Sequence, residues 1–241
     1  MNKYNIININ DVVSTNTYAL SLKGKDVFKE GLVILAKHQK QGKGQRGNIW
    51  ESEKGKNIII SIVIEPHIAI DRQFEINKII TVAILDLLSE LKIDGKIKWP
   101  NDILIGNSKV AGVLIENVIS KKIVTHSVIG IGLNVNQVQF NNYSPKATSL
   151  KIERSKEFLL NILIEKLLIN IQKRVINYRL GLDINIEYLN SIFKKDIVSV
   201  FEIDSQMFNG IIRGVTDRGL IIIETESKLK KFDVKEIKMI F

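Results

Sequence analysis

The feature that most constrains the fold is a run of β-branched residues, Ile58 to Ile64, which is apolar at nearly every position. Such a run is typical of a strand buried on both faces, because a half-exposed strand alternates polar and apolar side chains. A second short run, Leu32 to Ala36, ends in a glycine-rich basic loop. From Gln73 to Leu91, apolar side chains instead recur every three or four positions, which predicts an amphipathic helix. We therefore expect a sheet with one face covered by this helix.

The segment from Ile123 to Val135 predicts a further strand with an unusual surface. Gly130 and Gly132 should lie on the same side as Asn134, because successive side chains of a strand point to opposite faces. Two glycines on one side remove the side chains that would otherwise cover the sheet there. The sequence therefore predicts a space for a ligand over this strand.

The C-terminal third changes character from helical to β-rich. Ser155 is the expected N-cap of a long helix that runs to about Leu180, with Gly181 as its C-terminal stop. From Asp196 onward, short β-rich pieces alternate with turn residues, which predicts a small barrel of about 50 residues. The predicted turns are Asp204-Ser205, Asn209-Gly210, Asp217 to Gly219 and Glu226 to Lys228.

Composition excludes several classes of protein. Hydrophobic residues make up 45% and charged residues 25% of the 241 residues, which is typical of a globular protein and not of a disordered one. No apolar run approaches the roughly 20 residues of a membrane-spanning helix, and the first residues lack the pattern of a secretory signal. We therefore expect a cytoplasmic protein with no membrane partner. With no cysteine and three scattered histidines, the chain predicts no metal cluster of its own.

The formal net charge of +9 raises the possibility of a nucleic-acid partner. Lysine, isoleucine and asparagine recur along the whole length, however, which favours a general compositional bias over one basic face. We therefore expect no nucleic-acid binding.

The strongest local motif is the basic loop from Gln39 to Asn48, which leads to Trp50. Its three glycines let the backbone approach a ligand closely, and its cations suit phosphate oxygens. The glycine spacing also fits a dinucleotide or kinase loop, but no helix follows directly and no other kinase motif occurs. The loop is not a Walker A motif either, because Lys-Ser or Lys-Thr does not follow its last glycine. A flexible basic surface loop is the remaining alternative.

A second motif combines Lys98 to Asp102 with Lys109 to Gly112. Segments 102–105 and 110–117 flank a Gly-Asn-Ser turn, which predicts a hairpin that brings Lys109 near Asp102. Such a pair suits an anionic reaction centre, although a surface salt bridge beside a core tryptophan is the commoner role. A third motif, Ser14-Thr15-Asn16, is by itself typical of a helix cap or turn.

Together these motifs resemble the biotin protein ligase family along the whole chain. The matching pattern is an early Ser-Thr-Asn, a basic glycine loop ending near a tryptophan, Lys-Trp-Pro-Asn-Asp, Lys-x-x-Gly, and Gly-x-Gly-x-Asn, all present in order. The resemblance implies an α+β fold with a mixed β-sheet and helices, similar to class II aminoacyl-tRNA synthetases. It also implies a catalytic domain over residues 1–188 and an SH3-like barrel over residues 189–241.

The resemblance also implies a role for each motif. Catalytic roles fall to Lys109, Arg46 and Asp102. Biotin would be bound by Ser14, Thr15, Asn16, Gln39, Gly42, Lys43, Gly44, Gln45, Lys109 and Gly112. The nucleotide would be bound by Arg46, Asn48, Trp50, Asn101, Asp102 and Asn134. The chain departs from the usual family loop at Lys43, Gln45 and Asn48, where arginine or another cation is common, and lysine lacks the bidentate fork of arginine.

The implied activity is ATP-dependent formation of biotinyl-AMP, followed by transfer of biotin to a lysine of a biotin carboxyl carrier protein or domain. ATP and Mg²⁺ would be required, and no metal would be held by the protein alone. Because Ser14 lies so close to the start, we expect no N-terminal DNA-binding domain, and the protein should be a monomer or homodimer. The alternatives are a lipoate or octanoate ligase of the same superfamily and a basic nucleic-acid-binding module.

Overall fold

The computed structural model describes residues 4–141, 144–226, 228–234 and 236–240, without the side chain of Arg46. Its main feature is a mixed sheet with the strand order β1-β2-β5-β10-β9-β8-β7, in which β6 also pairs with β10. Strands β1 and β2 are parallel and the other neighbours are antiparallel. These strands are β1 (Asn5–Val12), β2 (Leu32–Gln39), β5 (Ile58–Ile64), β6 (Ile68–Ala69), β7 (Gly95–Lys98), β8 (Asp102–Ile105), β9 (Ser108–Ser120) and β10 (Ile123–Leu133). The prediction of a mixed sheet is confirmed.

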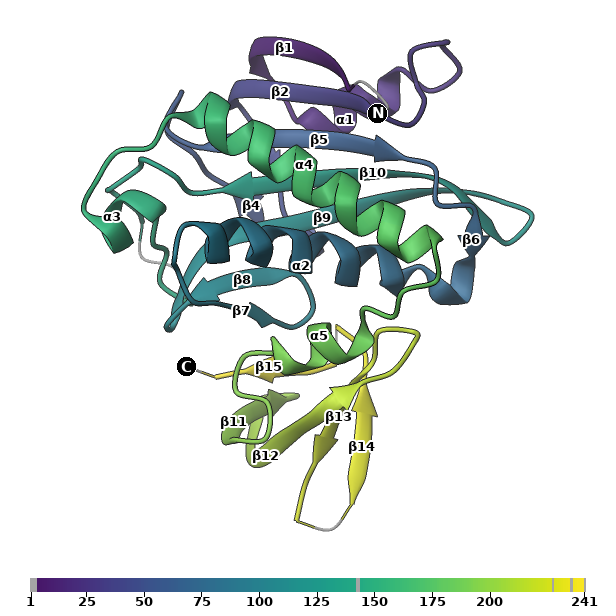
Figure 1. The fold of residues 1–241 in the computed structure, drawn as a ribbon. Helices are drawn as coiled ribbons and strands as arrows, with labels where there is room; N and C mark the ends of the chain where they lie inside the picture. Colours follow the sequence, from purple (N-terminus) through teal and green to yellow (C-terminus); the bar gives the residue numbers. More distant parts are fainter. Residues whose placement is uncertain (1–3, 142–143, 227, 235, 241) are drawn as a thin grey trace.

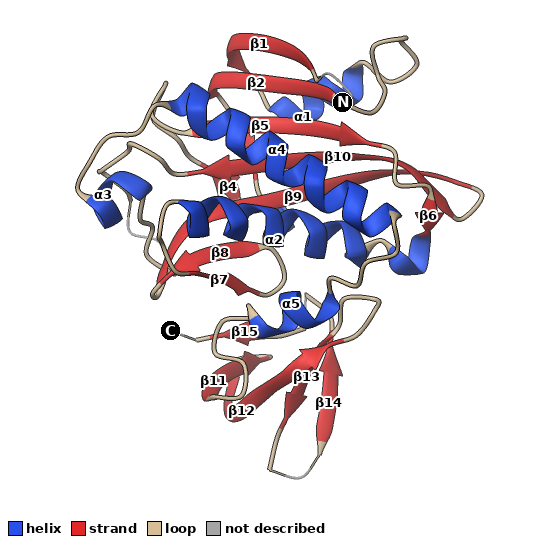
Figure 2. Cartoon of the chain, viewed as in Figure 1, coloured by secondary structure: helices blue, strands red, loops and turns tan. Residues whose placement is uncertain are grey.

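Two long helices, α2 (Phe74–Glu90) and α4 (Leu160–Arg179), cover one face of this sheet (Figures 1 and 2). Strand β5 is buried at every position, as its unbroken apolar run predicts. A short helix, α1 (Thr15–Ser21), packs on the opposite face against β2, β5 and β10. Part of that opposite face stays open, and this is where the cavity described below lies.

The long helix begins later than its sequence pattern predicts. Ser155 does not cap α4; it ends the short helix α3 (Leu150–Arg154) in the left-handed region, with φ of 50°. Ser149 caps α3 instead, and α4 follows after its own N-cap, Leu159. A serine before an apolar run signals a cap, but the sequence does not distinguish the ends of two consecutive helices. The predicted stop at Gly181 is confirmed, with φ of 81°.

The C-terminal region forms a second sheet with the order β14-β13-β12-β11-β15, which confirms the prediction of a separate β-rich unit. Its strands are β11 (Val198–Ile203), β12 (Gln206–Val215), β13 (Ile221–Glu224), β14 (Leu229–Phe232) and β15 (Lys238–Met239). Turns occur as predicted at Asp204-Ser205 and at Asp217 to Gly219. The Glu226 to Lys228 turn includes Ser227, which lies outside the described residues.

The turn predicted at Asn209-Gly210 is wrong, because both residues lie inside β12. Packing requires a glycine at position 210, because a Cβ there would lie 2.6 Å from the Ile223 side chain on the neighbouring strand. The dipeptide is a frequent turn signal, but a glycine also serves where two chains approach closely.

The C-terminal sheet attaches directly to the end of the main sheet. The Trp99 indole N–H donates to the Gly219 carbonyl over 2.9 Å, and Phe193 N–H donates to the Ile97 carbonyl over 2.8 Å. Helix α5 (Asn185–Asn190) precedes this contact and spans the expected boundary at residues 188/189. Among the described residues, no helix is long and apolar enough to cross a membrane.

Candidate active site

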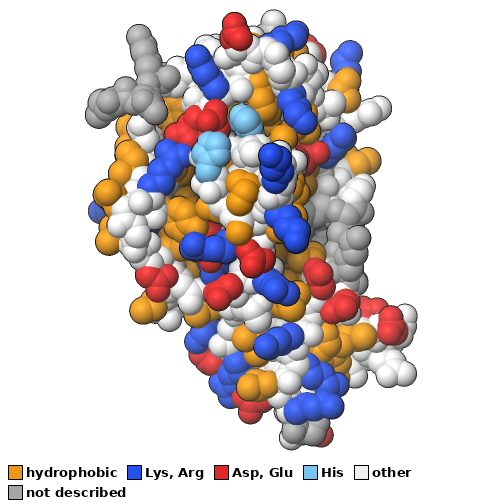
Figure 3. Space-filling view, turned by 90° about the vertical axis from the view of Figure 1, so that its right-hand side faces the viewer, with side chains coloured by type: hydrophobic (Ala, Val, Ile, Leu, Met, Phe, Trp, Pro, Cys, Tyr) orange, Lys and Arg blue, Asp and Glu red, His pale blue; other side chains and the backbone are white. Residues whose placement is uncertain are grey.

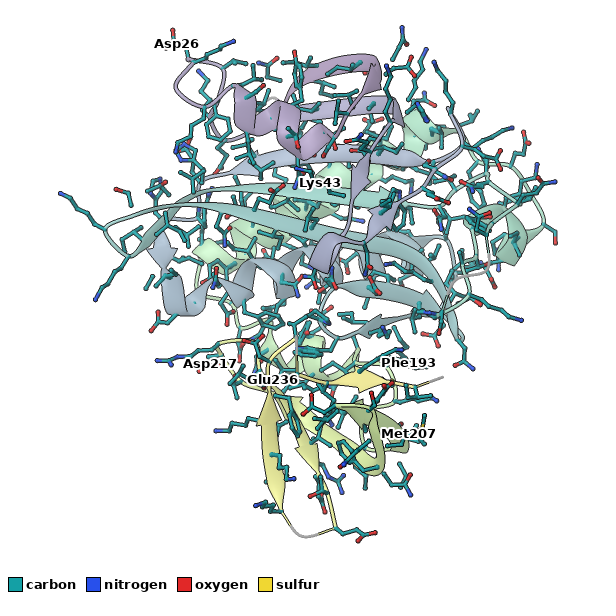
Figure 4. All side chains as sticks on the ribbon, turned by 180° about the vertical axis from the view of Figure 1, so that it is seen from behind. Asp26, Lys43, Phe193, Met207, Asp217 and Glu236 are labelled. Carbon is teal, nitrogen blue, oxygen red and sulfur yellow. The ribbon has the colours of Figure 1, made fainter. Side chains whose placement is uncertain are left out.

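A cavity of about 220 Å³ lies where the open face of the main sheet meets the C-terminal sheet. A small hairpin, β3 (Gly42–Lys43) and β4 (Ile49–Trp50), crosses over this face with Lys43 at one end (Figure 4). Of the residues predicted for the site, the cavity is lined by Ser14, Thr15, Asn16, Gln39, Lys43, Gly44, Gln45, Asn48, Trp50, Asn101, Asp102, Lys109 and Gly112. Residues far apart in sequence therefore converge on one cavity.

Glycines form the floor of the cavity. Gly132 of β10 lies opposite Gly112 of β9, and a Cβ on Gly132 would come within 2.3 Å of the Trp50 indole. A Cβ on Gly130 would come within 2.6 Å of the Asn16 amide oxygen. Trp50 and Asn16 therefore occupy space that only a bare backbone leaves available.

The polar end of the cavity is held by hydrogen bonds from α1. The Thr15 backbone N–H and hydroxyl both donate to the Gln39 side-chain oxygen, over 2.8 and 3.0 Å. The Asn16 amide nitrogen donates to Glu116 over 2.8 Å, and its oxygen accepts from the Ser61 hydroxyl over 2.6 Å. These buried side chains are fixed in place and present hydroxyl and amide groups to a ligand.

The Ser-Thr-Asn motif has a structural role as well as a place in the cavity. Ser14 is the N-cap of α1, as expected for a Ser-Thr-Asn sequence taken by itself, and it also lines the cavity. Ser61 and Glu116 support Asn16 and were not predicted. A buried serine within an otherwise apolar run was the available signal for Ser61, whereas only the strand pairing reveals Glu116.

The reactive end of the cavity holds two lysines around one carboxylate. Lys109 Nζ lies 2.6 Å from one Asp102 oxygen, and Lys98 Nζ lies 3.9 Å from the other. The Lys109 ammonium also lies 5.4 Å from the centre of the Trp50 ring, which favours a cation–π contact. The predicted hairpin does bring Lys109 to Asp102. Lys98 lines the same cavity, yet the sequence interpretation gave it no role.

Two buried polar atoms in this region have no hydrogen-bond partner among the described residues: the Trp50 indole nitrogen and the Asn134 side-chain oxygen. Buried polar groups are normally paired, so each is a position where a ligand atom would be stabilised. Asn134 lies behind the cavity lining and donates its amide to the Thr148 carbonyl over 3.0 Å. Asn101 donates to the Val113 carbonyl and so fixes the segment before Asp102.

Other predicted residues have different surroundings. Gly42 is absent from the cavity lining, and a Cβ there would meet the Trp50 carbonyl at 2.3 Å, so its size is set by pairing within the hairpin. The side chain of Arg46 lies outside the described part of the structure. Among the described residues, no group of three or more His, Cys, Asp and Glu side chains could hold a metal ion.

Comparison with known proteins identifies the family. Residues 10–134 match the biotin/lipoate A/B protein ligase family. The bifunctional ligase/repressor BirA of Bacillus subtilis is 28% identical over 95% of this chain and 72% of its own length. A biotin–[acetyl-CoA-carboxylase] ligase of Mycobacterium tuberculosis is 29% identical over 69% of this chain and 62% of its own length.

Solved structures share the fold. The biotin protein ligase of Aquifex aeolicus, determined in complex with biotin and ATP, superposes with a TM-score of 0.79 at 23% identity, covering 98% of both chains. The Helicobacter pylori biotin acetyl coenzyme A carboxylase synthetase covers 95% of this chain and 100% of its own, with a TM-score of 0.60 at 22% identity. The sequence match over more than half of the chain, together with these shared folds, places the protein in the biotin/lipoate A/B protein ligase family.

Proposed function

We propose that this protein activates biotin as biotinyl-AMP and transfers it to a lysine of a biotin carboxyl carrier protein or domain. The observation that carries the proposal is the Lys109–Asp102 pair at the end of a glycine-floored cavity whose other end is polar. A free carboxylic acid does not acylate an amine near neutral pH. A site for this reaction must therefore first bring two anions together, which requires cations between them.

The polar end of the cavity fits the ureido ring of biotin. Thr15 uses its hydroxyl hydrogen on Gln39, so its oxygen lone pairs remain for a ligand N–H. The buried Asn16 and the half-buried Gln39 line the cavity beside Thr15, so a polar ring meets amide and hydroxyl groups at this end. The cavity therefore favours biotin over lipoate or octanoate, whose distal ends offer no urea group.

In the first step, a biotin carboxylate oxygen attacks the α-phosphorus of ATP, the bond to the β-phosphate breaks, and pyrophosphate leaves. Lys109 would contact the carboxylate and the α-phosphate, while Lys98 would face the departing phosphates. The loop residues Lys43, Gly44, Gln45 and Asn48, which line the cavity, would lie over the reacting groups, and Trp50 would support the adenine. Negative charge developing on phosphoryl oxygens is stabilised by cations already in position.

The residues present also fit the Mg²⁺ that such a reaction uses. The Asp102 carboxylate, which lines the cavity, is a hard oxygen donor, and Mg²⁺ is commonly bound by one or two protein oxygens together with substrate phosphates. The ion supplies charge neutralisation on the phosphates.

In the second step, the acceptor lysine nitrogen attacks the acyl carbon and the bond to AMP breaks. The amine must lose a proton, and Asp102 is the carboxylate placed to accept it or to orient the amine. Lys98 and Lys109 would hold Asp102 and the AMP phosphate in place during this transfer.

The basic nucleic-acid-binding alternative has little support. On the face shown in Figure 3, Lys and Arg side chains are interspersed with acidic and apolar ones, without a broad single-sign field. Binding to nucleic acid usually requires clustered cations. We propose that the positive net charge reflects composition.

The proposal is tested with purified protein, Mg²⁺-ATP, labelled biotin and a biotin carrier domain. Pyrophosphate release and label on the carrier are expected. Lys109→Met should lower the rate of pyrophosphate release by at least about 100-fold, because a preformed cation at the phosphoryl group is lost.

Lys151→Met is the matched control, since Lys151 pairs with Glu157 on the surface at 2.7 Å, and it should keep the full rate. If the wild-type protein forms no acyl-adenylate, the proposed function is wrong. If Lys109→Met is as active as Lys151→Met, Lys109 is not the activating cation.

A further inference from the structure

Asn16 lies across three neighbouring strands of the main sheet. It stands over Gly130 of β10, whose register partners are Ser61 on β5 and Leu114 on β9. A Cβ on Gly130 would come within 2.6 Å of the Asn16 amide oxygen, so the side chain rests directly on the strand backbone. Glu116 follows two residues after Leu114 and therefore points to the same face of the sheet. Asn16 is thus held between groups from the two strands that flank β10.

All but one of the hydrogen-bonding positions of the Asn16 amide are occupied. Its nitrogen donates one hydrogen to the Leu114 carbonyl over 3.2 Å and the other to a Glu116 carboxylate oxygen over 2.8 Å. Its oxygen accepts from the Ser61 hydroxyl over 2.6 Å. An amide has two N–H donors and two oxygen lone pairs, so one lone pair is left. Asn16 lines the cavity, and a ligand therefore meets it as a hydrogen-bond acceptor.

The neighbouring amide, that of Gln39, has the opposite polarity. Its oxygen accepts from both the backbone N–H and the hydroxyl of Thr15, over 2.8 and 3.0 Å, so both lone pairs are occupied. Gln39 also lines the cavity and offers a ligand its amide hydrogens. The polar end of the cavity therefore combines a donor at Gln39 with an acceptor at Asn16. A cyclic urea carries the complementary groups, a carbonyl oxygen beside an N–H.

The partners of Asn16 are not equivalent in setting its orientation. The Ser61 hydroxyl can donate or accept, so it does not by itself choose between the two orientations of the amide. The Leu114 carbonyl and the Glu116 carboxylate accept hydrogen bonds and donate none. The contact with the carboxylate is the shorter of the two and is charge-assisted, which makes it the stronger one. The orientation of Asn16 therefore depends chiefly on Glu116.

We propose that Glu116 is a positioning residue that sets the specificity of this site for biotin, by holding the Asn16 oxygen as an acceptor for a ureido N–H. Glu116 is not among the described residues that line the cavity, so it acts through Asn16. Without the carboxylate, one hydrogen of a buried amide loses its partner. Turned toward the cavity, that hydrogen would face the ureido N–H, donor against donor. Because this role concerns recognition of biotin, it rests on the proposed function.

Calorimetry with biotin tests this role. Glu116→Leu removes the acceptor at similar size and should lower biotin affinity by at least about tenfold. Glu116→Gln keeps an oxygen that can accept from Asn16, and its affinity should stay within about threefold of the wild type. Glu224→Leu is the matched control and should bind biotin like the wild type. Glu224 is also half-buried on a strand and accepts from a side chain, that of Arg213, but it does not line the described cavity.

Steady-state kinetics separate a positioning role from a loss of folded protein. In pyrophosphate release, Glu116→Leu should raise the KM for biotin by at least about tenfold, while kcat and the KM for ATP stay within about twofold of the wild type. The contact holds biotin equally before and during the reaction, which is why kcat is spared. A smaller folded fraction would instead lower kcat at unchanged KM, and that result would contradict the role. Urea unfolding of each variant checks that it folds cooperatively.

A double-mutant cycle shows whether Glu116 acts through Asn16. Asn16→Ala removes the amide that the carboxylate orients, and it should weaken biotin binding by itself. In that background, Glu116→Leu should change biotin affinity by less than about twofold, because no amide remains to be positioned. The same loss in both backgrounds would show that Glu116 acts by another route and would overturn the proposal.

The remaining outcomes separate this role from the proposed function. If Glu116→Leu binds biotin like Glu224→Leu while the wild type forms the acyl-adenylate, the proposed function stands and the positioning role is wrong. If Glu116→Gln is as weak as Glu116→Leu, the charge matters and not the acceptor, which also contradicts the role. If the wild type neither binds biotin nor releases pyrophosphate, the proposed function itself fails, and the role of Glu116 fails with it.

Discussion

At the level of single residues, the candidate site depends on the absence of side chains at three glycines. Because Gly112, Gly130 and Gly132 have no side chains, Trp50 and Asn16 can lie directly against the strand backbone. The alternation of a β-strand predicts that Gly130 and Gly132 share a face. It does not predict that an indole from a distant hairpin fills the space above them, because that contact needs the tertiary fold.

Gly132→Ala should therefore displace the Trp50 indole, since the new methyl group would lie 2.3 Å from it. We expect at least a tenfold loss of biotin affinity in calorimetry and a changed tryptophan fluorescence spectrum.

Gly214→Ala is the matched control for this change. A Cβ at Gly214 meets its nearest neighbours at 3.9 Å, an ordinary contact, so affinity and spectrum should stay as in the wild type. Equal biotin affinity in the two variants would argue against a ligand space beside Trp50.

At the level of elements, α4 is tied to the residue just before the first strand through a half-buried tyrosine. The Tyr4 hydroxyl donates to the Leu168 carbonyl of α4 over 2.9 Å. Burial, helped by the negative charge of Glu30, raises the pKa of Tyr4 to about 12. The folded protein therefore holds this proton more tightly than the unfolded chain, whose tyrosine ionises near pH 10.

The sign of the pH dependence follows from this difference. The contribution of Tyr4 to stability is complete below about pH 10 and is lost as the pH rises through about 12. Urea unfolding of Tyr4→Phe should show a smaller loss of stability over this interval than the wild type. Tyr18→Phe, which leaves Tyr4 in place, should retain the wild-type slope; equal slopes in all three proteins would contradict the assignment.

At the level of the whole molecule, the C-terminal sheet forms part of the cavity wall. Phe201, Ile212, Ile237 and Met239 line it from that side. Trp99 stands just before Asn101 and Asp102 and is held by the Gly219 carbonyl of the C-terminal sheet. We propose that residues 1–188 and 189–241 are two units with this junction between them, although α5 spans the division in the chain.

Trp99→Phe should loosen the junction, because a buried indole hydrogen bond worth about 1 kcal/mol is lost. Amide exchange in the 216–219 turn should become faster. Tyr4→Phe at neutral pH removes a comparable side-chain-to-carbonyl hydrogen bond near the opposite edge of the main sheet, so it serves as the control. Unchanged exchange at 216–219 in Trp99→Phe would show that this bond does not hold the two sheets together.

The sequence alone determined which segments are strands and helices wherever the apolar side chains follow a clear pattern along the chain. Ile58 to Ile64 and the segment from Gln73 to Leu91 correspond to β5 and α2, and the ordered motifs indicated the family. Local hydrophobic patterns and turn chemistry act over a few residues, so they can be recognised without the fold.

Only the tertiary structure decided which distant side chains meet. It placed Ser61 and Glu116 behind Asn16, brought Lys98 to Asp102, and moved the start of α4 past Ser155. These facts depend on strand register and on packing between elements, and a sequence pattern carries neither because both are set by contacts across the whole molecule.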